Sequence, residues 1–388
     1  MKSENIAHRI ILAGDLLPSA GNINLFEKGD SQTLYGPEVC QLFADADFSI
    51  VNLEGVLTES EDKQEKVFGP YLKAPRKTIR GIQELGVKAV ALANNHVTDY
   101  GNQGCCDTIE TLKSSGIKYV GAGNSISTIQ NSLTIELADQ KICIYNVSES
   151  FFAIPDEKTA GVNLYDEWIV LNEIKKLKET HDYLIVIYHG GAEYFPFPTP
   201  QTRTRFHRMA ECGADFITAQ HTHCIGCEEW YNGSYLLYGQ GNFLFAHQKK
   251  YPNLTKEGLV TELVFSGIDV KIKHHIVNIV GDVLQYDANQ DFTFFKERSS
   301  RIEEQDFIMD EFKKIKADDV MIKFLTGSKG KYPFRRVLSK VFPKTMKKYV
   351  GNSFTRRQTL LNYFIMKSDR TREDMLAIWQ YVLDTTNR

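Results

Sequence analysis

Short apolar runs alternate with amphipathic helical segments between residue 9 and about residue 285. Runs of β-branched and other apolar residues of this length predict buried strands. In the segments between them, apolar residues recur at three- or four-residue spacing, as at Ile79, Ile82 and Leu85. This spacing predicts helices that pack one face on a sheet. The alternation as a whole predicts an α/β or mixed sandwich core.

Three of the predicted helices end in the same way, with a glycine just before the next strand. Gly86 precedes the run VKAVALA, Gly116 precedes IKYVGAG, and Gly213 precedes DFITAQ. A glycine past the last apolar position supplies the left-handed residue with which many helices end. The later runs at 234–245, 258–267 and 270–287 predict antiparallel strands joined by short turns.

The pattern changes near residue 290, so we predict a core domain over residues 1–290 and a mainly helical segment over 291–388. The centre of this segment is basic, and aromatic residues are interleaved with the charges. Two interpretations remain open: a helical cap with a solvated basic face, or a peripheral contact with a membrane or an acidic polymer. The basic residues include Lys313, Lys314, Lys316, Lys329, Lys331, Arg335, Arg336, Lys340, Lys344, Lys347, Lys348, Arg356 and Arg357.

Composition narrows the class of protein further. The 388 residues are 42% hydrophobic and 24% charged, with a formal charge of −3, which is ordinary for a globular protein and predicts no general affinity for nucleic acid. The seven cysteines have no framework spacing, which favours a reducing compartment. The first residues contain no signal-peptide pattern, and no stretch has the length of a membrane span. We therefore expect a cytoplasmic protein.

Polar side chains of the metal-ligand type stand where the apolar runs end. Carboxylate, amide and imidazole groups together suit a borderline or hard divalent ion such as Mn²⁺, Zn²⁺ or Fe²⁺. Because parallel strands bring their ends to one edge of a sheet, we expect these side chains to hold one or two ions. His221 and His223 are two residues apart, and on an extended strand they would share a face. The candidate ligands are Asp15, Glu54, Asn95, His189, His221 and His223.

The segment Asn95-His96 follows the apolar strand VKAVALA and precedes VTDYG. An amide ligand beside a histidine that need not bind metal would place a Lewis-acid group next to a proton donor. Asp99 is the expected partner that orients His96. The alternative is an ordinary turn, because Asn and Asp favour turn geometry and the segment ends at Gly101.

The motifs GDLLPSAG, NLEG, LANNHVTDYG, GAG, YHGGAEYF, GADFITAQHTH and YGQGNFLF occur in this order between residues 14 and 245. In this set the chain resembles the CapA family, the bacterial capsule and poly-γ-glutamate biosynthesis group of the calcineurin-like metallophosphatase superfamily. The resemblance covers roughly residues 9–250. It implies a four-layer αββα sandwich with two central mixed sheets and a dinuclear metal site at the strand ends.

Carried over by position, the resemblance implies that Asp15 binds the first ion and that Glu54 bridges both. Asn95, His189 and His221 would hold the second ion, and His223 would return to the first. His96 would be the general acid. Two positions depart from the superfamily pattern: Leu17 stands where a histidine is usual, and Glu54 replaces the common aspartate. We therefore expect the first ion to be held more loosely than the second.

The function implied by the resemblance is a metal-dependent hydrolase or transferase with a metal-activated hydroxide, linked to the synthesis of a capsule or poly-γ-glutamate type of polymer. Its substrate would be an anionic small molecule or polymer with phosphoester or amide linkages. Lys73, Arg203 and Arg205 are candidates for binding the substrate, although each could equally be a solvated charge. Two alternatives remain: a non-catalytic accessory subunit of a polymer-synthesis complex, and a metal-assisted peptide epimerase.

Overall fold

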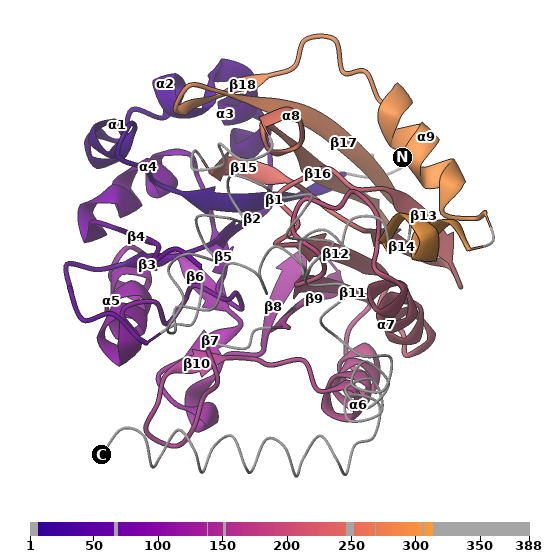
Figure 1. The fold of residues 1–388 in the computed structure, drawn as a ribbon, viewed down its shortest axis with the longest axis horizontal. Coiled ribbons are helices and arrows are strands. Elements are labelled where there is room, and N and C mark those ends of the chain that lie inside the picture. Colours follow the sequence, from indigo (N-terminus) through magenta and orange to yellow (C-terminus); the bar gives the residue numbers. More distant parts are fainter. Residues whose placement is uncertain are drawn as a thin grey trace, which may run out of the picture. The chain divides into compact units, whose positions relative to one another are not determined.

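The computed structural model describes residues 7–65, 69–137, 139–149, 153–245, 252–267, 269–304 and 306–312. The chain divides into two compact units, Met1–Asp310 and Glu311–Arg388. Every helix and strand named below belongs to the first unit (Figure 1). The basic residues 313–357 lie outside the described residues.

The first of two large sheets has eight strands, whose order across the sheet is β18-β17-β16-β1-β2-β5-β6, with β15 paired to β1. Strands β1, β2, β5 and β6 are mutually parallel, whereas β16, β17 and β18 continue the sheet as antiparallel strands. The strand bounds are β1 His8–Leu17, β2 Phe48–Leu53, β5 Ala89–Ala91, β6 Lys118–Val120, β15 Asn242–Phe245, β16 Glu257–Ser266, β17 Asp269–Val280 and β18 Val283–Tyr286.

The second large sheet has six strands in the order β13-β14-β12-β11-β9-β8. The four strands β14, β12, β11 and β9 are parallel, and β13 and β8 close the two edges as antiparallel strands. Both sheets are therefore mixed. The strand bounds are β8 Ser132–Leu137, β9 Gln140–Ser148, β11 Tyr183–His189, β12 Phe216–Gln220, β13 Glu228–Tyr231 and β14 Ser234–Leu237.

Alternate residues of the central strands face different layers. In β1, Ile10 and Leu12 belong to the hydrophobic cluster between the two sheets, whereas Ile11 and Ala13 face the opposite side. In β11, Ile185 and Ile187 belong to the same inter-sheet cluster, while the outward residues pack on helices. Because strand side chains point alternately to the two faces, strands buried on both faces become continuous apolar runs.

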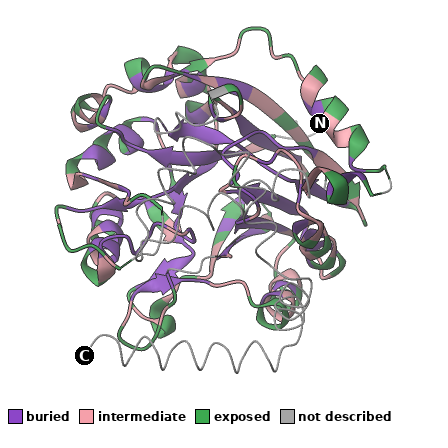
Figure 2. Ribbon diagram, in the orientation of Figure 1, coloured by how far each residue is buried: buried purple, intermediate pink, exposed green. Residues whose placement is uncertain are grey.

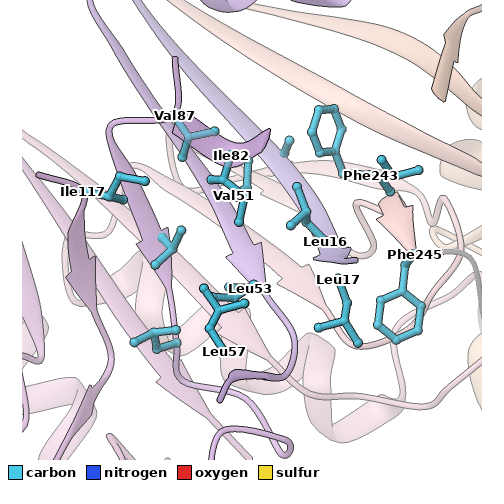
Figure 3. Close-up of a cluster of buried hydrophobic side chains, with 14 of the residues drawn as sticks. Leu16, Leu17, Val51, Leu53, Leu57, Ile82, Val87, Ile117, Phe243 and Phe245 are labelled. Carbon is cyan, nitrogen blue, oxygen red and sulfur yellow. The ribbon is translucent and has the colours of Figure 1, made fainter. Parts of the chain in front are cut away.

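Helices cover the outer face of each sheet. Helices α1 (Ile23–Lys28) to α5 (Gly101–Ser114) contribute to the cluster on the outer face of the eight-stranded sheet (Figure 3). Helices α6 (Glu167–Lys178) and α7 (Pro200–Glu211) pack on the six-stranded sheet through Val170, Phe206 and Met209. Figure 2 shows buried strands inside and exposed residues on the outer helices. The predicted four-layer αββα sandwich with two mixed sheets is confirmed.

Of the helices on the outer face of the eight-stranded sheet, α2 spans Ser31–Tyr35, α3 spans Pro37–Ala44 and α4 spans Ile79–Glu84. The two other helices are α8 (Pro252–Thr255) and α9 (Thr293–Arg301), and short 3-10 turns lie at Arg76–Thr78 and Ile126–Thr128. Two small sheets pair β3 (Val56–Leu57) with β4 (Lys73–Ala74) and β7 (Ala122–Gly123) with β10 (Gly161–Val162). Helix α9 packs its Phe295 into the inter-sheet cluster, and the first unit continues to Asp310. The division at residue 290 stays a prediction.

The structure confirms the predicted helix ends but only part of the predicted strand directions. The three glycines after α4, α5 and α7 have left-handed φ angles of 89°, 71° and 109°, as predicted for Gly86, Gly116 and Gly213. The run 234–245 fits the antiparallel prediction only in part, because it forms two strands in different sheets: β14 pairs antiparallel with β13 but parallel with β12, and β15 runs parallel to β1. The runs 258–267 and 270–287 form the antiparallel strands β16, β17 and β18, as predicted. None of the described helices has both the length and the apolar character needed to cross a membrane.

Candidate metal centre

The ends of five parallel strands carry the candidate ligands to one place between the sheets. Strand β1 brings Asp15, and Glu54 follows β2 directly. Strand β5 leads into Asn95 and His96, β11 ends at His189, and β12 leads into His221 and His223. In open α/β sheets, ligands bind in the crevice at the carboxyl ends of parallel strands.

Glu54 lies at the centre of this group. Its side chain is fully buried, and its Oε1 lies 3.7 Å from Nε2 of His189 and 3.7 Å from Nε2 of His223. Oε1 also lies 3.9 Å from Nε2 of His96. Within the described part of the chain, neither carboxylate oxygen of Glu54 has a hydrogen-bond partner. A buried carboxylate without hydrogen bonds is costly unless a cation accompanies it.

Two groups of potential ligand atoms share Glu54. One consists of Asp15, Glu54 and His223, and the other of Glu54, His189 and His221; in each group the ligand atoms lie within 4.8 Å of one another. Neither group contains a cysteine, and oxygen with imidazole nitrogen is the donor set that Mn²⁺, Zn²⁺ and Fe²⁺ accept. The residues therefore fit one or two divalent ions, with Glu54 between them.

Asn95 lies beside the second group. Its side-chain Oδ1 is 2.9 Å from Nε2 of His189, the same nitrogen that faces Glu54. The amide oxygen and the imidazole nitrogen therefore point to one position. This placement agrees with a shared role as ligands, which stays a prediction.

His96 is held differently from the other histidines. Its Nδ1 lies 2.7 Å from Oδ2 of Asp99, and the same oxygen accepts a hydrogen bond from the amide of Leu72 at 2.7 Å. With Nδ1 held by Asp99, Nε2 of His96 is directed at Glu54. His96 thus faces the centre without belonging to either group of potential ligands. The proton-donor role of His96 and the orienting role of Asp99 stay predictions.

The pair His221 and His223 reaches the centre in a way that the sequence did not indicate. Strand β12 ends at Gln220, so neither histidine lies on it and the expectation of a shared strand face is wrong. Both have positive φ angles, 84° for His221 and 54° for His223. Non-glycine residues adopt this left-handed conformation at a cost and often at functional sites. The left-handed backbone at these two residues bends the chain so that both rings face the centre.

Buried asparagines that were not predicted from the sequence support the candidate ligands. Asn52 donates a hydrogen bond to Oδ1 of Asp15 at 2.7 Å, and Oδ1 of Asn242 lies 2.9 Å from Nδ1 of His223. Asn146 accepts from the amide of Ala93 and donates to the carbonyl of Ile187, so it ties the two sheets together beneath the centre. The sequence signal that could have identified Asn52 and Asn242 is an asparagine within an apolar run, as in NLEG and YGQGNFLF.

Charge and burial shift the acid–base behaviour of the centre. Burial raises the pKa of Glu54 well above its ordinary value, and the negative charge of Asp15 raises it further. Burial alone would lower the pKa of His223, but Glu54 and Asp15 outweigh it and raise that pKa to about 10. Burial and the neighbouring imidazoles lower the pKa of His189, and burial lowers that of His221. A proton on His223 therefore balances part of the carboxylate charge.

The rim of the centre is formed by the segment that follows His189. Oε1 of Glu193 lies 3.9 Å from Nε2 of His221, and the ring of Tyr194 stacks on that of His223 at 5.9 Å between centroids. The amide of Tyr194 donates to the carbonyl of Thr222 at 2.8 Å. The side chain of Glu193 is 46% exposed, whereas that of His221 is 18% exposed. The loop after β11 and the loop after β12 are thus joined where the centre meets solvent.

Leu17 occupies the position where the superfamily usually has a histidine. Its side chain is buried in the apolar cluster on the outer face of the eight-stranded sheet, beside Phe245 (Figure 3). The ring of Phe245 in turn stacks on that of His223 at 5.0 Å. This position therefore supplies packing behind His223 and no ligand, so the first group consists of Asp15, Glu54 and His223.

The three cations predicted to bind substrate are engaged with other groups. Lys73 donates to Oε1 of Glu61 at 2.6 Å, and its Nζ lies 4.7 Å from the ring centroid of Tyr100. Arg203 forms an ion pair with Glu229 at 2.7 Å. Arg205 lies 3.0 Å from Oε1 of Glu149. Substrate binding by these residues stays a prediction.

Comparison with known proteins places the chain in a family. Residues 9–247, more than half of the chain, match the family described as bacterial capsule synthesis protein PGA_cap. Capsule biosynthesis protein CapA of Bacillus anthracis is 29% identical over 196 residues, which cover 49% of this chain and 48% of that protein. A probable polyglutamine synthesis accessory protein of Mycobacterium tuberculosis is 24% identical over 209 residues, which cover 50% of this chain and 55% of that protein.

The chain spans about half the length of the curated relatives it matches. A crystal structure of a phosphatase from Mycoplasma pneumoniae covers 74% of this chain and 99% of its own, with a TM-score of 0.44 and 18% identity. That likeness is too weak to carry an argument. The family match confirms the resemblance to CapA proteins that the ordered motifs indicated: the chain belongs to the bacterial capsule synthesis protein family PGA_cap.

Proposed function

We propose that the chain is a CapA-like metal-dependent hydrolase or transferase with a dinuclear centre built on Glu54. The observation that carries this proposal is the buried carboxylate of Glu54, whose oxygens have no hydrogen-bond partner in the described residues and which both groups of potential ligands share. A carboxylate kept in such surroundings costs stability unless cations bind it. Divalent ions held by the two groups would balance this charge.

Each residue of the centre has a distinct part in this proposal. Asp15 and His223 hold the first ion with Glu54, and Asn95, His189 and His221 hold the second. Manganese, zinc and iron suit these donors. Bound divalent ions supply Lewis acidity and lower the pKa of a water molecule so that it can attack a phosphoryl or carbonyl group. Asn52 and Asn242 keep Asp15 and His223 oriented for this task.

His96 supplies the proton that the leaving group requires. Its Nε2 faces the centre, 3.9 Å from Glu54, while Asp99 fixes the ring through Nδ1. A carboxylate on Nδ1 stabilises the doubly protonated ring, from which Nε2–H can be donated. Because His96 stands outside both ligand groups, its removal need not release metal.

The proposed substrate is anionic, either a phosphoester or an amide-linked polymer of the poly-γ-glutamate type. The family description and the name of the Bacillus anthracis relative, a capsule biosynthesis protein, support a polymer. Among the candidate cations, Lys73 is placed beside the proposed proton donor, because the amide of its neighbour Leu72 donates a hydrogen bond to Asp99. A contact of the basic residues 313–357 with a membrane or the polymer completes the proposal.

A second candidate function is that of an accessory subunit without turnover. The mycobacterial relative is described as an accessory protein of polyglutamine synthesis, which favours this possibility. The two candidate functions predict the same metal content, but only the enzyme would turn over a substrate.

The test is elemental analysis of the purified chain followed by turnover assays with manganese, zinc or iron. The enzyme proposal predicts up to two ions per chain and hydrolysis of either an aryl phosphate or a γ-glutamyl peptide. Two bound ions without turnover of either substrate would favour the accessory role. A chain that takes up no divalent ion would contradict both the dinuclear centre and the enzyme.

A further inference from the structure

The loop His189-Gly190-Gly191 links a proposed ligand to the rim of the centre, and its backbone lies against one acidic side chain. A Cβ on Gly190 would lie 2.8 Å from Cβ of Glu149 and 2.8 Å from the ring of Tyr188. Gly191 has a φ of 98°, which side chains rarely adopt. The two glycines let the loop turn directly over Glu149.

Glu149 contacts this loop at successive residues. Its Oε2 accepts hydrogen bonds from the hydroxyl of Tyr188 at 2.6 Å and from the amide of Gly191 at 3.1 Å. Its own amide donates to the carbonyl of His189 at 3.0 Å. Glu149 therefore fixes the backbone on both sides of the imidazole that faces Glu54.

Arg205 of α7 holds Glu149 from the other side. Its Nη1 donates to the hydroxyl of Tyr188 at 2.6 Å and lies 3.0 Å from Oε1 of Glu149. The guanidinium also lies over the ring of Tyr165, 4.4 Å from its centroid. The Arg205 side chain is only 14% exposed and that of Glu149 is 28% exposed, so solvent screens this ion pair incompletely.

The direction of these side chains separates them from the metal ligands. Tyr188 belongs to the cluster between the six-stranded sheet and its helices, whereas the next residue, His189, faces Glu54. We infer that Glu149 and Arg205 are positioning residues, which hold His189 in place for the second ion through the backbone of residues 188–191. The manganese-binding test of this inference rests on the proposed metal centre, whereas the hydrogen-exchange test does not.

Partners that orient a metal ligand typically change affinity by about 10- to 100-fold when they are removed. Arg205→Met and Glu149→Leu should therefore weaken one of the two manganese-binding steps by at least about tenfold and leave the other unchanged. Glu149→Gln keeps an acceptor oxygen and should fall between wild type and Glu149→Leu. The double variant should lose little more than either single variant, because both residues act in one chain of contacts.

Arg203→Met is the matched control. It removes an arginine two residues earlier on α7, whose ion pair with Glu229 is also partly buried but does not touch the loop after His189. It should leave both manganese affinities unchanged, even where it lowers the melting temperature as much as Arg205→Met does. Equal losses of affinity in Arg203→Met and Arg205→Met would overturn the inference, because a general loss of stability would then explain both.

A second measurement does not depend on metal. In metal-free protein, the Gly191 amide should exchange its hydrogen at least about tenfold faster in Arg205→Met than in wild type or Arg203→Met, because its acceptor Glu149 is no longer held. Unchanged exchange in Arg205→Met would overturn the positioning role. If the wild-type chain takes up no manganese, the proposed function fails, and the exchange experiment still decides the role of Glu149 and Arg205.

Discussion

Replacing Glu54 by glutamine should make the metal-free protein more stable while it removes the response to metal. Glu54 is fully buried, and its oxygens have no hydrogen-bond partner in the part of the chain that the structure describes. Burial and the charge of Asp15 raise the pKa of Glu54, so above pH 4.5 the ionised carboxylate costs stability in the fold. Glutamine has nearly the same shape and carries no charge.

The expected size follows from these surroundings. The glutamine amide stays a buried polar group, so the gain comes only from removing the charge, whose burial costs more than that of a neutral amide. His223 loses one neighbouring carboxylate in the variant but keeps Asp15 at 3.3 Å, which offsets part of the gain. We therefore expect the free energy of unfolding of metal-free Glu54→Gln to rise by about 1 kcal/mol at pH 7. In the wild type, an ion at 100 times its dissociation constant should add about 2.7 kcal/mol per site.

The assay is urea unfolding of metal-stripped protein, followed by circular dichroism, with and without manganese. Wild type should gain stability from both sites, and Glu54→Gln should gain from neither, since both ligand groups contain Glu54. Asp15→Asn and His221→Gln are the comparison variants, because each belongs to one group and should lose about half of the gain. A metal-free Glu54→Gln that is less stable than wild type, or one that keeps the full manganese response, would refute this reasoning.

Three further predictions concern single histidines. His96→Ala should abolish turnover of a metal-loaded enzyme while metal content stays at the wild-type level; turnover that survives would exclude His96 as the proton donor. His223 has a pKa of about 10 and is protonated at pH 7, so metal binding should release protons and tighten as pH rises, as calorimetry in buffers of different ionisation enthalpy would show. Burial lowers the pKa of His274 to about 3. The unfolded chain therefore binds this proton first, and about 3 kcal/mol of stability should be lost between pH 6.5 and pH 4; acid unfolding that is identical in His274→Gln would contradict this.

Much of the fold could be predicted because the strands are short and buried on both faces. Their apolar runs mark where each strand ends, and Asp15, Glu54 and His189 stand at those ends. The pairing of strands was harder to predict. The run 234–245 continues β14 into β15 through Gly239 and Gly241, both with positive φ, and this connection crosses from one sheet to the other. A sequence shows the glycines but not the second sheet.

The sequence indicated which side chains gather at the strand ends, but not which residues support them. His221 and His223 were identified by residue type, but their left-handed backbone depends on the loop after His189, which binds Thr222. Arg203 and Arg205 could not be separated by sequence, because their partners Glu229 and Glu149 come from distant strands and loops.

In the proposed centre, two divalent ions share Glu54. Anomalous diffraction at the metal absorption edge, from crystals of the chain grown with manganese or zinc, tests it directly. A dinuclear centre should give one peak among Glu54, Asn95, His189 and His221, and a weaker peak among Asp15, Glu54 and His223. A map with no peak in contact with Glu54 would contradict it.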